Sequence, residues 1–139
     1  SMASYIAQKT VKLLINSGHD LSTSKVAILG LSFKENCPDV RNTRVIDIVK
    51  ELKEYGIESV ICDPVSDEKA SFKLYGINLA KLEDIKDFDA LVLAVSHECF
   101  KENIKEIVND SLKDNNSVLI DVKSIVPNEL ASKYTYWSL

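Results

Sequence analysis

The residues best suited to bind a charged ligand lie between Gly30 and Arg44, which reads Gly-Leu-Ser-Phe-Lys-Glu-Asn-Cys-Pro-Asp-Val-Arg-Asn-Thr-Arg. This segment follows a short apolar run and precedes a helical pattern, and it carries the cations Lys34, Arg41 and Arg44. At the start of a helix, free backbone N–H groups and the helix dipole already favour an anion. The combination therefore predicts a phosphate-binding loop.

Two other residues of this segment limit the kind of nucleotide that it can hold. Gly30 is its only glycine, so the segment lacks the G-x-G-x-x-G pattern with which dinucleotide folds approach a pyrophosphate. We therefore do not expect a dinucleotide to bind here in the usual way. Phe33 offers a flat apolar surface for a base or sugar, although a phenylalanine after a strand is more often part of the core.

Three further side chains have both a functional and a structural interpretation. Cys37 lies among basic residues, where a thiol can become nucleophilic, but free cysteines are most often small buried hydrophobes. His97 follows an apolar strand pattern and can donate to a phosphate or ribose, or simply pack in its loop. Asp63, before Pro64, can accept ribose hydroxyls or form an ordinary turn. We favour the structural role for all three, and expect neither a catalytic residue nor a metal site.

Composition limits the class of protein. The 139 residues are 45% hydrophobic, which suits one compact domain. Acidic and basic residues are mixed along the chain with a net charge of -4, so no broad cationic field for nucleic acid is expected. No apolar run approaches the roughly 18 residues that cross a membrane. Three widely spaced cysteines and no secretory leader lead us to expect a cytoplasmic protein with reduced thiols.

Strand and helix patterns alternate along the chain. Apolar runs typical of buried strands occur at 25–30, 58–62, 89–95 and 117–121, and 134–139 is a fifth candidate. Helical spacing occurs at 4–15, 41–55, 67–74 and 100–108. We predict an α/β fold: a doubly wound, mostly parallel, Rossmann-like sheet with helices on both faces, preceded by one helix. The ligand of such a sheet lies beside the first strand-to-helix loop, here residues 30–44.

Residues 28–43 resemble the loop found in the carboxy-terminal domain of the UDP-glucose/GDP-mannose dehydrogenase family. They read Ile-Leu-Gly-Leu-Ser-Phe-Lys-Glu-Asn-Cys-Pro-Asp-Val-Arg-Asn-Thr. The resemblance continues through 45–56, 62–64, 94–97 and 121–123. Cys37-Pro38 and Tyr136-Trp137 further resemble the branch that oxidises UDP-N-acetylhexosamines for surface-polysaccharide synthesis, including the Vi-antigen enzymes.

The resemblance implies a parent enzyme of three parts: an NAD-binding Rossmann domain, a central helical region at a homodimer interface, and this domain closing over a UDP-sugar. The family oxidises the sugar C6 alcohol twice, with two NAD reduced and a cysteine of the central domain as nucleophile. We expect residues 1–2 to be a cloning remnant, 3–20 to end the central region and its linker, and 21–139 to be the UDP-sugar-binding domain. The family's catalytic cysteine and lysine are not matched here, so this chain alone should be inactive.

Site residues carry over from the resemblance at four positions. Phe33 and Lys34 match the pair that contacts the UDP-sugar, and Lys123 falls near a basic residue that is arginine in UDP-glucose relatives. Arg41 matches the arginine that reaches the NAD bound by the first domain. The implied substrate is UDP-N-acetylglucosamine or UDP-N-acetylgalactosamine. A free-standing nucleotide-binding or regulatory module without catalysis is the alternative, and a GDP-mannose enzyme would differ only in base and sugar.

Overall fold

The computed structural model of residues 1–139 contains one five-stranded sheet with the strand order β2-β1-β3-β4-β5. Its strands are β1 (Val26–Leu29), β2 (Val60–Cys62), β3 (Ala90–Leu93), β4 (Val118–Asp121) and β5 (Thr135–Ser138). Every neighbouring pair is parallel, so the sheet is wholly and not just mostly parallel. Each of the five runs predicted from the sequence forms a strand.

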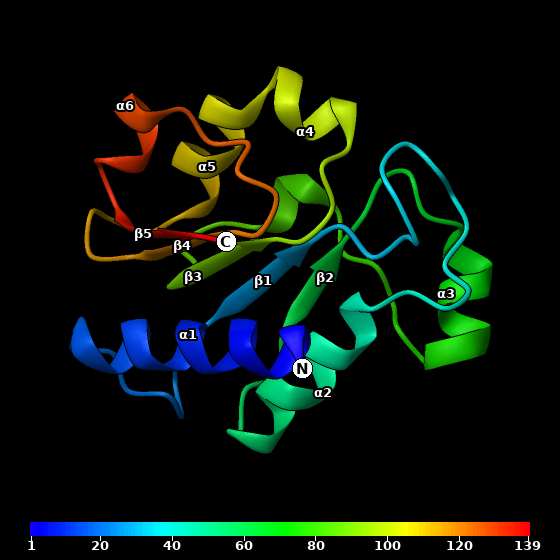
Figure 1. Ribbon diagram of the computed structural model, residues 1–139, viewed down its shortest axis with the longest axis horizontal. Coiled ribbons are helices and arrows are strands. Elements are labelled where there is room, and N and C mark those ends of the chain that lie inside the picture. Colours follow the sequence, from blue (N-terminus) through cyan, green and yellow to red (C-terminus); the bar gives the residue numbers. More distant parts are fainter.

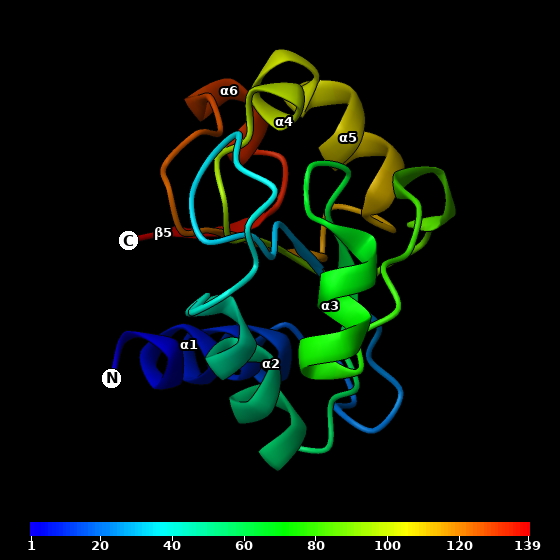
Figure 2. The same cartoon turned by 90° about the vertical axis from the view of Figure 1, so that its right-hand side faces the viewer.

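Helices cover both faces of this sheet (Figure 1). One face carries α1 (Met2–Asn16) and α2 (Val45–Glu54), and the other carries α4 (Glu98–Glu102), α5 (Ile104–Ser111) and α6 (Asn128–Ala131). The end-on view in Figure 2 separates the two helical layers, with α3 (Glu68–Tyr75) at the β2 edge. The single-turn helix η1 (Leu82–Asp84) precedes β3. The predicted doubly wound α/β fold is confirmed.

Side chains of each strand alternate between two cores, because successive residues of a strand point to opposite faces of the sheet. In β1, Val26 and Ile28 pack in the core on the α1–α2 side, whereas Ala27 and Leu29 pack in the core under the other helices. All four are buried. A strand covered on both faces needs apolar residues at every position, which explains its unbroken apolar run.

The first helix, which was expected before the sheet in sequence, packs onto the sheet in the structure. Five residues at helical spacing join the core on its side of the sheet: Ala3, Ile6, Ala7, Val11 and Leu14. The helix contacts both α2 and β4. Neither α1, which has 15 residues and is the longest, nor any other helix is long and apolar enough to cross a membrane.

Two helices differ from the prediction. The helix expected from Arg41 begins only at Val45, because residues 41–44 form turns in which Asn42 has a φ of +58°. The helix predicted over 100–108 is divided into α4 and α5 at Asn103, whose φ is −124°. The sequence analysis missed η1 and α6, since three and four residues are too few to show a helical period.

Candidate nucleotide-binding site

The connections from β1 and β3 leave the sheet in opposite directions. β1 lies between β2 and β3, and residues 30–44 lead from it to α2 on one face. Residues 94–97 lead from β3 to α4 on the other face. Loops that diverge from adjacent parallel strands open a crevice at the carboxyl edge, where doubly wound folds bind their ligands.

A hollow of about 320 Å³ lies at this crevice. Its lining comes from the segments after β1, β3 and β4 and from the start of α2: Ser32, Phe33, Lys34, Glu35, Asn42, Thr43, Arg44, Val45, Ala94, Val95 and Lys123. The structure thus brings together three residues predicted from the sequence, Phe33, Lys34 and Lys123, from distant parts of the chain. All three are exposed, and Phe33 is exposed to 58%.

The charge of this hollow is mainly positive. Lys34, Arg44 and Lys123 line it against a single acid, Glu35. None of the three cations forms an ion pair within the chain. The amino end of α2 at Val45 adds the positive end of a helix dipole. The site therefore has the charge and the polar groups to hold an anion.

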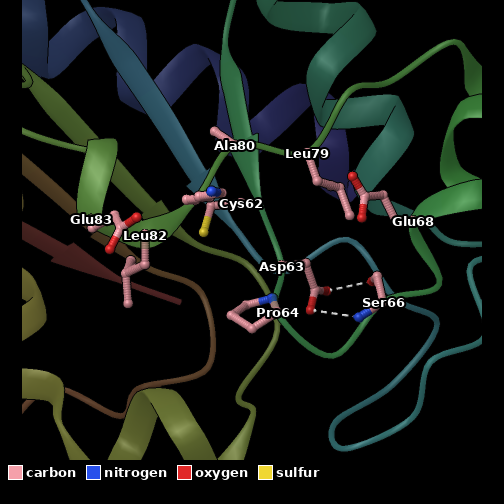
Figure 3. A pocket seen from close by; sticks show the side chains of 10 residues that line it. Cys62, Asp63, Pro64, Ser66, Glu68, Leu79, Ala80, Leu82 and Glu83 are labelled. Atoms are coloured by element: carbon pink, nitrogen blue, oxygen red, sulfur yellow. Dashed lines mark hydrogen bonds between the residues drawn. The ribbon is translucent and has the colours of Figure 1, made fainter.

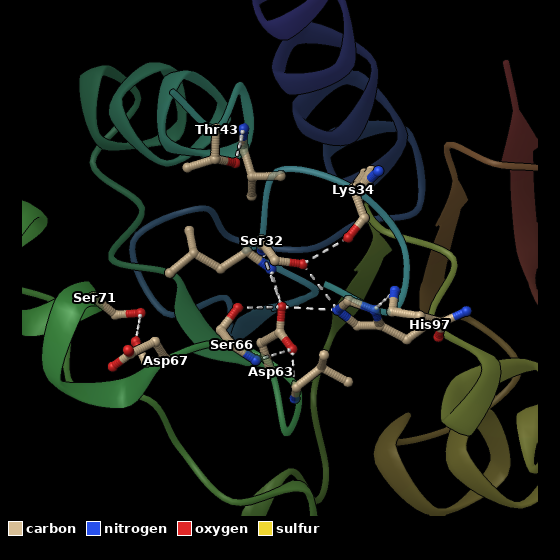
Figure 4. A network of polar contacts seen from close by, with 12 residues as sticks. Ser32, Lys34, Thr43, Asp63, Ser66, Asp67, Ser71 and His97 are labelled. Atoms are coloured by element: carbon tan, nitrogen blue, oxygen red, sulfur yellow. Dashed lines mark hydrogen bonds and ion pairs between the residues drawn. The ribbon is translucent and has the colours of Figure 1, made fainter. Parts of the chain in front are cut away.

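Asp63, which directly follows β2, fixes the backbone at the start of this loop (Figure 4). Its Oδ2 accepts hydrogen bonds from the N–H groups of Leu31 (2.6 Å) and Ser32 (3.1 Å) and from the Ser66 hydroxyl (2.7 Å). Burial alone would raise the pKa of this carboxyl, but its hydrogen bonds, including one from His97, outweigh burial and hold the pKa well below its usual range. Asp63 is thus a structural acid and not a free acceptor for ribose.

His97 is completely buried beside Asp63. Its Nε2 lies 3.0 Å from Asp63 Oδ2 and 3.3 Å from the Ser32 hydroxyl, while its Nδ1 lies 2.9 Å from the backbone nitrogen of Asn36. The ring also packs against Phe100, with 5.3 Å between ring centroids. The packed, hydrogen-bonded role that we favoured for His97 matches this geometry.

A second buried aspartate holds the loop that carries Lys123. Asp121 ends β4, and its carboxylate accepts hydrogen bonds from the N–H groups of Ile125 (3.0 Å) and Val126 (2.9 Å) and from the Tyr136 hydroxyl (2.6 Å). Burial and the bond to Asp121 raise the pKa of Tyr136 to about 12. Lys123 lies in the turn between these anchors with its side chain exposed.

Arg41, the fourth predicted residue, does not line the hollow. It lies in a separate groove of about 430 Å³ between residues 38–41 and α3. Its guanidinium donates from Nε and Nη2 to the two carboxylate oxygens of Asp39, both at 3.0 Å, and its side chain stays 76% exposed. The hydrogen bonds from Arg41 lower the pKa of Asp39 to about 2. Arg41 is therefore accessible to a group outside this chain.

Gly30 lets the loops after β1 and β3 touch. Its φ is +99°, and a Cβ built on it would lie 2.5 Å from Val95 Cβ and 2.8 Å from the Val95 backbone nitrogen. No L-residue side chain fits such a gap. The glycine at the start of the loop after β1 thus allows the two loops to pack closely at the crevice.

A larger hollow of about 460 Å³ lies at the end of β2 (Figure 3), but its lining is less suited to an anion. Its charged side chains include the acids Glu68 and Glu83 as well as Lys81, and Asp63 is held by its own hydrogen bonds. Cys62 also lines it, and burial raises the pKa of that thiol to about 12. Because its thiol is unreactive and its acidic side chains outnumber its single lysine, this hollow is the weaker candidate for an anion-binding site.

The three cysteines are free thiols. Cys37 is half-buried, forms no hydrogen bond with a histidine or carboxylate, and does not line the hollow of Lys34. Burial raises the pKa of Cys99. No cysteine is therefore paired with a base that could activate it.

The sequence analysis missed several residues that build the site. Thr43 and Asn42 line the hollow from the turn before α2, and Asn36 is tied to His97. Asp121 had a usable signal, because it follows the apolar run of β4 as Asp63 follows that of β2. Two aspartates at the ends of two predicted parallel strands already indicate a pair of anchors at one edge of the sheet.

Fold and site together define a Rossmann-like domain with a mainly positive crevice at the carboxyl edge of its sheet. Residues 27–128 match the sequence model of the UDP binding domain of the UDP-glucose/GDP-mannose dehydrogenase family. Because the match covers most of the chain, the chain belongs to this family. The resemblance noted in the sequence is thereby confirmed.

Individual relatives agree with this assignment. The chain is 40% identical over 129 residues, 93% of its length, to a UDP-N-acetyl-D-glucosamine 6-dehydrogenase of Salmonella typhi, of which it covers 30%. It is 38% identical to the protein CapL of Staphylococcus aureus in an alignment of 140 positions that covers all of this chain and 32% of CapL. The chain thus spans about a third of these relatives.

Solved structures show the same fold. The UDP-N-acetyl-mannosamine dehydrogenase Cap5O of Staphylococcus aureus superposes with a TM-score of 0.72 at 25% identity, over 99% of this chain and 30% of that one. A UDP-D-ManNAc dehydrogenase of Pyrococcus horikoshii reaches a TM-score of 0.77 at 20% identity, again over 99% of this chain and 30% of that one.

Proposed function

We propose that this chain is the carboxy-terminal, UDP-sugar-binding domain of an NAD-dependent nucleotide-sugar 6-dehydrogenase. The parent oxidises the C6 alcohol of a UDP-hexose to the uronate with two NAD, for surface-polysaccharide synthesis. Its substrate is UDP-N-acetylglucosamine or UDP-N-acetylgalactosamine. A relative that is 40% identical and is described as a UDP-N-acetyl-D-glucosamine 6-dehydrogenase supports the N-acetylhexosamine.

The observation that carries this proposal is the convergence of Phe33, Lys34 and Lys123 around one crevice. The two lysines have no partner within the chain, so a diphosphate supplies the negative charge that they lack. The exposed ring of Phe33 provides an apolar surface for the base or the sugar. A nucleotide diphosphate-sugar carries both kinds of group, a charged diphosphate and flat or apolar ring surfaces.

NAD is bound mainly by a part of the parent outside this chain. Gly30, the single glycine of the phosphate-binding loop, is used for the contact with Val95, so the loop does not fit a cofactor pyrophosphate of its own. Arg41 does fit a role at a site between domains, because its side chain is exposed and its Nη1 donors are not used in the pair with Asp39. Bound NAD would supply the hydride acceptor.

The remaining parts of the parent are the partners of this domain. Residues 3–20 form the end of the central helical region and its linker, residues 21–139 form the UDP-sugar-binding domain, and the parent is a homodimer through the central region. The catalytic cysteine and the NAD domain lie outside residues 1–139. This chain is therefore inactive alone and acts by holding the substrate.

Calorimetric titration of the chain with UDP, UDP-N-acetylglucosamine, UDP-N-acetylgalactosamine, UDP-glucose and GDP tests the proposal. We expect saturable binding of the UDP compounds, and a loss of at least about tenfold in affinity in Lys34→Ala, because a charge-assisted phosphate contact contributes about 1.5–3 kcal/mol. Lys113→Ala is the matched control. Lys113 is exposed, precedes β4 at the opposite edge of the sheet, and makes no side-chain contact with the site.

The outcomes separate the candidates clearly. Equal binding in wild type and Lys34→Ala would place the nucleotide elsewhere on the chain. Preference for GDP would assign the chain to a GDP-sugar enzyme. Tight binding of an unrelated nucleotide would contradict the dehydrogenase assignment and favour a regulatory module.

A further inference from the structure

We propose that His97 is a positioning residue for the nucleotide: its neutral form, with the proton on Nε2, anchors residues 31–36 so that Phe33 and Lys34 face the crevice. The inference rests on the proposed function for its ligand. It concerns a residue that lies under the binding loop and does not line the hollow. Its structural basis is the network in Figure 4.

The two ring nitrogens of His97 face groups of opposite character. Nδ1 lies 2.9 Å from the backbone nitrogen of Asn36, and a backbone N–H can only donate. Nδ1 must therefore be the acceptor and carry no proton. Nε2 then carries the proton and donates a hydrogen bond to Asp63 Oδ2 at 3.0 Å. Geometry thus fixes one tautomer of a fully buried ring.

Asn36 needs this anchor because its backbone is in a costly conformation. Its φ of +59° lies in the left-handed region, which costs an L-residue free energy. Two hydrogen bonds hold it there: its N–H donates to His97 Nδ1, and its side-chain Oδ1 accepts from the Glu98 N–H at 2.8 Å. Residues 97 and 98 therefore hold the carboxy-terminal end of segment 31–36 through the backbone nitrogen and the side-chain oxygen of Asn36.

The near end of the loop is fixed by Asp63. The N–H groups of Leu31 and Ser32 donate to its Oδ2, and the Ser32 hydroxyl donates to the Lys34 carbonyl at 3.0 Å. His97 joins the two ends, since it contacts Asp63 with one nitrogen and Asn36 with the other.

Phe33 and Lys34 lie between the two anchored ends with their side chains exposed. A loop whose backbone is already ordered loses less conformational entropy when a ligand binds, which strengthens binding.

A second proton on His97 would disrupt the anchor. The groups around the ring are the Asp63 carboxylate, the Ser32 hydroxyl, the Asn36 amide and the Phe100 ring. Asp63 is the only charged one, and its attraction does not remove the conflict at Nδ1, where the new N–H would face the N–H of Asn36.

Two variants separate the functions of the two nitrogens. In His97→Asn the amide lies near the position of Nδ1 and can still accept from Asn36, whereas in His97→Gln it lies near Nε2 and can still donate to Asp63. We expect UDP-N-acetylglucosamine affinity to fall about tenfold in His97→Gln and by no more than about threefold in His97→Asn, as expected for one buried hydrogen bond. His19→Asn is the matched control, because His19 is bonded to the Asn116 carbonyl at the opposite edge of the sheet.

The assay has two readouts. Calorimetry with UDP-N-acetylglucosamine compares the affinities of the wild type, the two His97 variants and the His19 control. Nitrogen-15 NMR of the ring and hydrogen exchange of the Asn36 amide should show, near neutral pH, an unprotonated Nδ1 and a protected N–H.

The two readouts distinguish this inference from the proposed function. A proton on Nδ1, an unprotected Asn36 amide, or wild-type affinity in His97→Gln would overturn the positioning role. Should the ring and amide behave as expected while the sugar nucleotide fails to bind, the anchor is supported and the proposed ligand is contradicted.

Discussion

Gly30→Ala is expected to destabilise the chain through two separable effects. The first is backbone strain, because Gly30 has a φ of +99°. The second is a collision, because the new Cβ would lie 2.5 Å from Val95 Cβ and 2.8 Å from the Val95 backbone nitrogen. The backbone atom cannot rotate away as a flexible side-chain end could. The segment after β3, which lines the crevice, must move instead.

The size of each effect follows from the structure. Positive φ costs an L-residue about 1–2 kcal/mol, and overpacking a close contact costs about 1–3 kcal/mol more. The sum is about 2–5 kcal/mol of unfolding free energy, a large part of the roughly 5–15 kcal/mol that stabilises a typical domain. For a chain of this size we expect the melting temperature to fall by about 7–17 °C.

Gly18→Ala is the matched control. Gly18 also has a positive φ, +84°, but a Cβ there would meet nothing within 4 Å. Only the backbone effect remains, so its melting temperature should fall by about 5 °C. Thermal unfolding followed by circular dichroism gives both values, and calorimetry should show weaker sugar-nucleotide binding in Gly30→Ala alone. If both variants melt within about 2 °C of one another, the contact with Val95 does not constrain the crevice and our reasoning is wrong.

Two further predictions concern charged groups. Asp63→Asn should lower the unfolding free energy by about 3 kcal/mol near neutral pH, since a buried donor set loses its carboxylate. The folded-state pKa of Asp63 lies below its unfolded value, so its stabilising contribution is present above about pH 4 and is lost as pH falls. The melting temperatures of the wild type and Asp63→Asn should therefore converge in acid. A difference in melting temperature that stays constant with pH would contradict this. In the full-length parent, Arg41→Lys should raise the KM for NAD about tenfold without changing the KM for the UDP-sugar, because a lysine cannot reproduce the planar fork. An equal rise in the KM for NAD and the KM for the UDP-sugar in steady-state kinetics would count against the inter-domain role.

Local patterns predicted most of the architecture. Apolar runs gave four strands, and the fifth candidate, residues 134–139, forms β5. A period of 3.6 residues gave α1 and α3 to within about two residues at each end. The pattern failed where the chain turns before a helix begins. The apolar spacing after Arg41 looked helical, yet the left-handed Asn42 and the hydrogen bond from Val45 N–H to the Thr43 hydroxyl delay the helix to Val45.

The sequence by itself determined the family, the fold class and the loop with its cations, because these depend on residue types and spacing within short segments. The tertiary structure alone decided which of these residues meet. It placed Lys123 and Lys34 at one hollow, paired the exposed Arg41 with Asp39, and buried His97 as a link between two loops. The reason is physical: parallel strands bring residues far apart in sequence to one edge of the sheet, and burial there selects hydrogen-bond partners that no local pattern specifies.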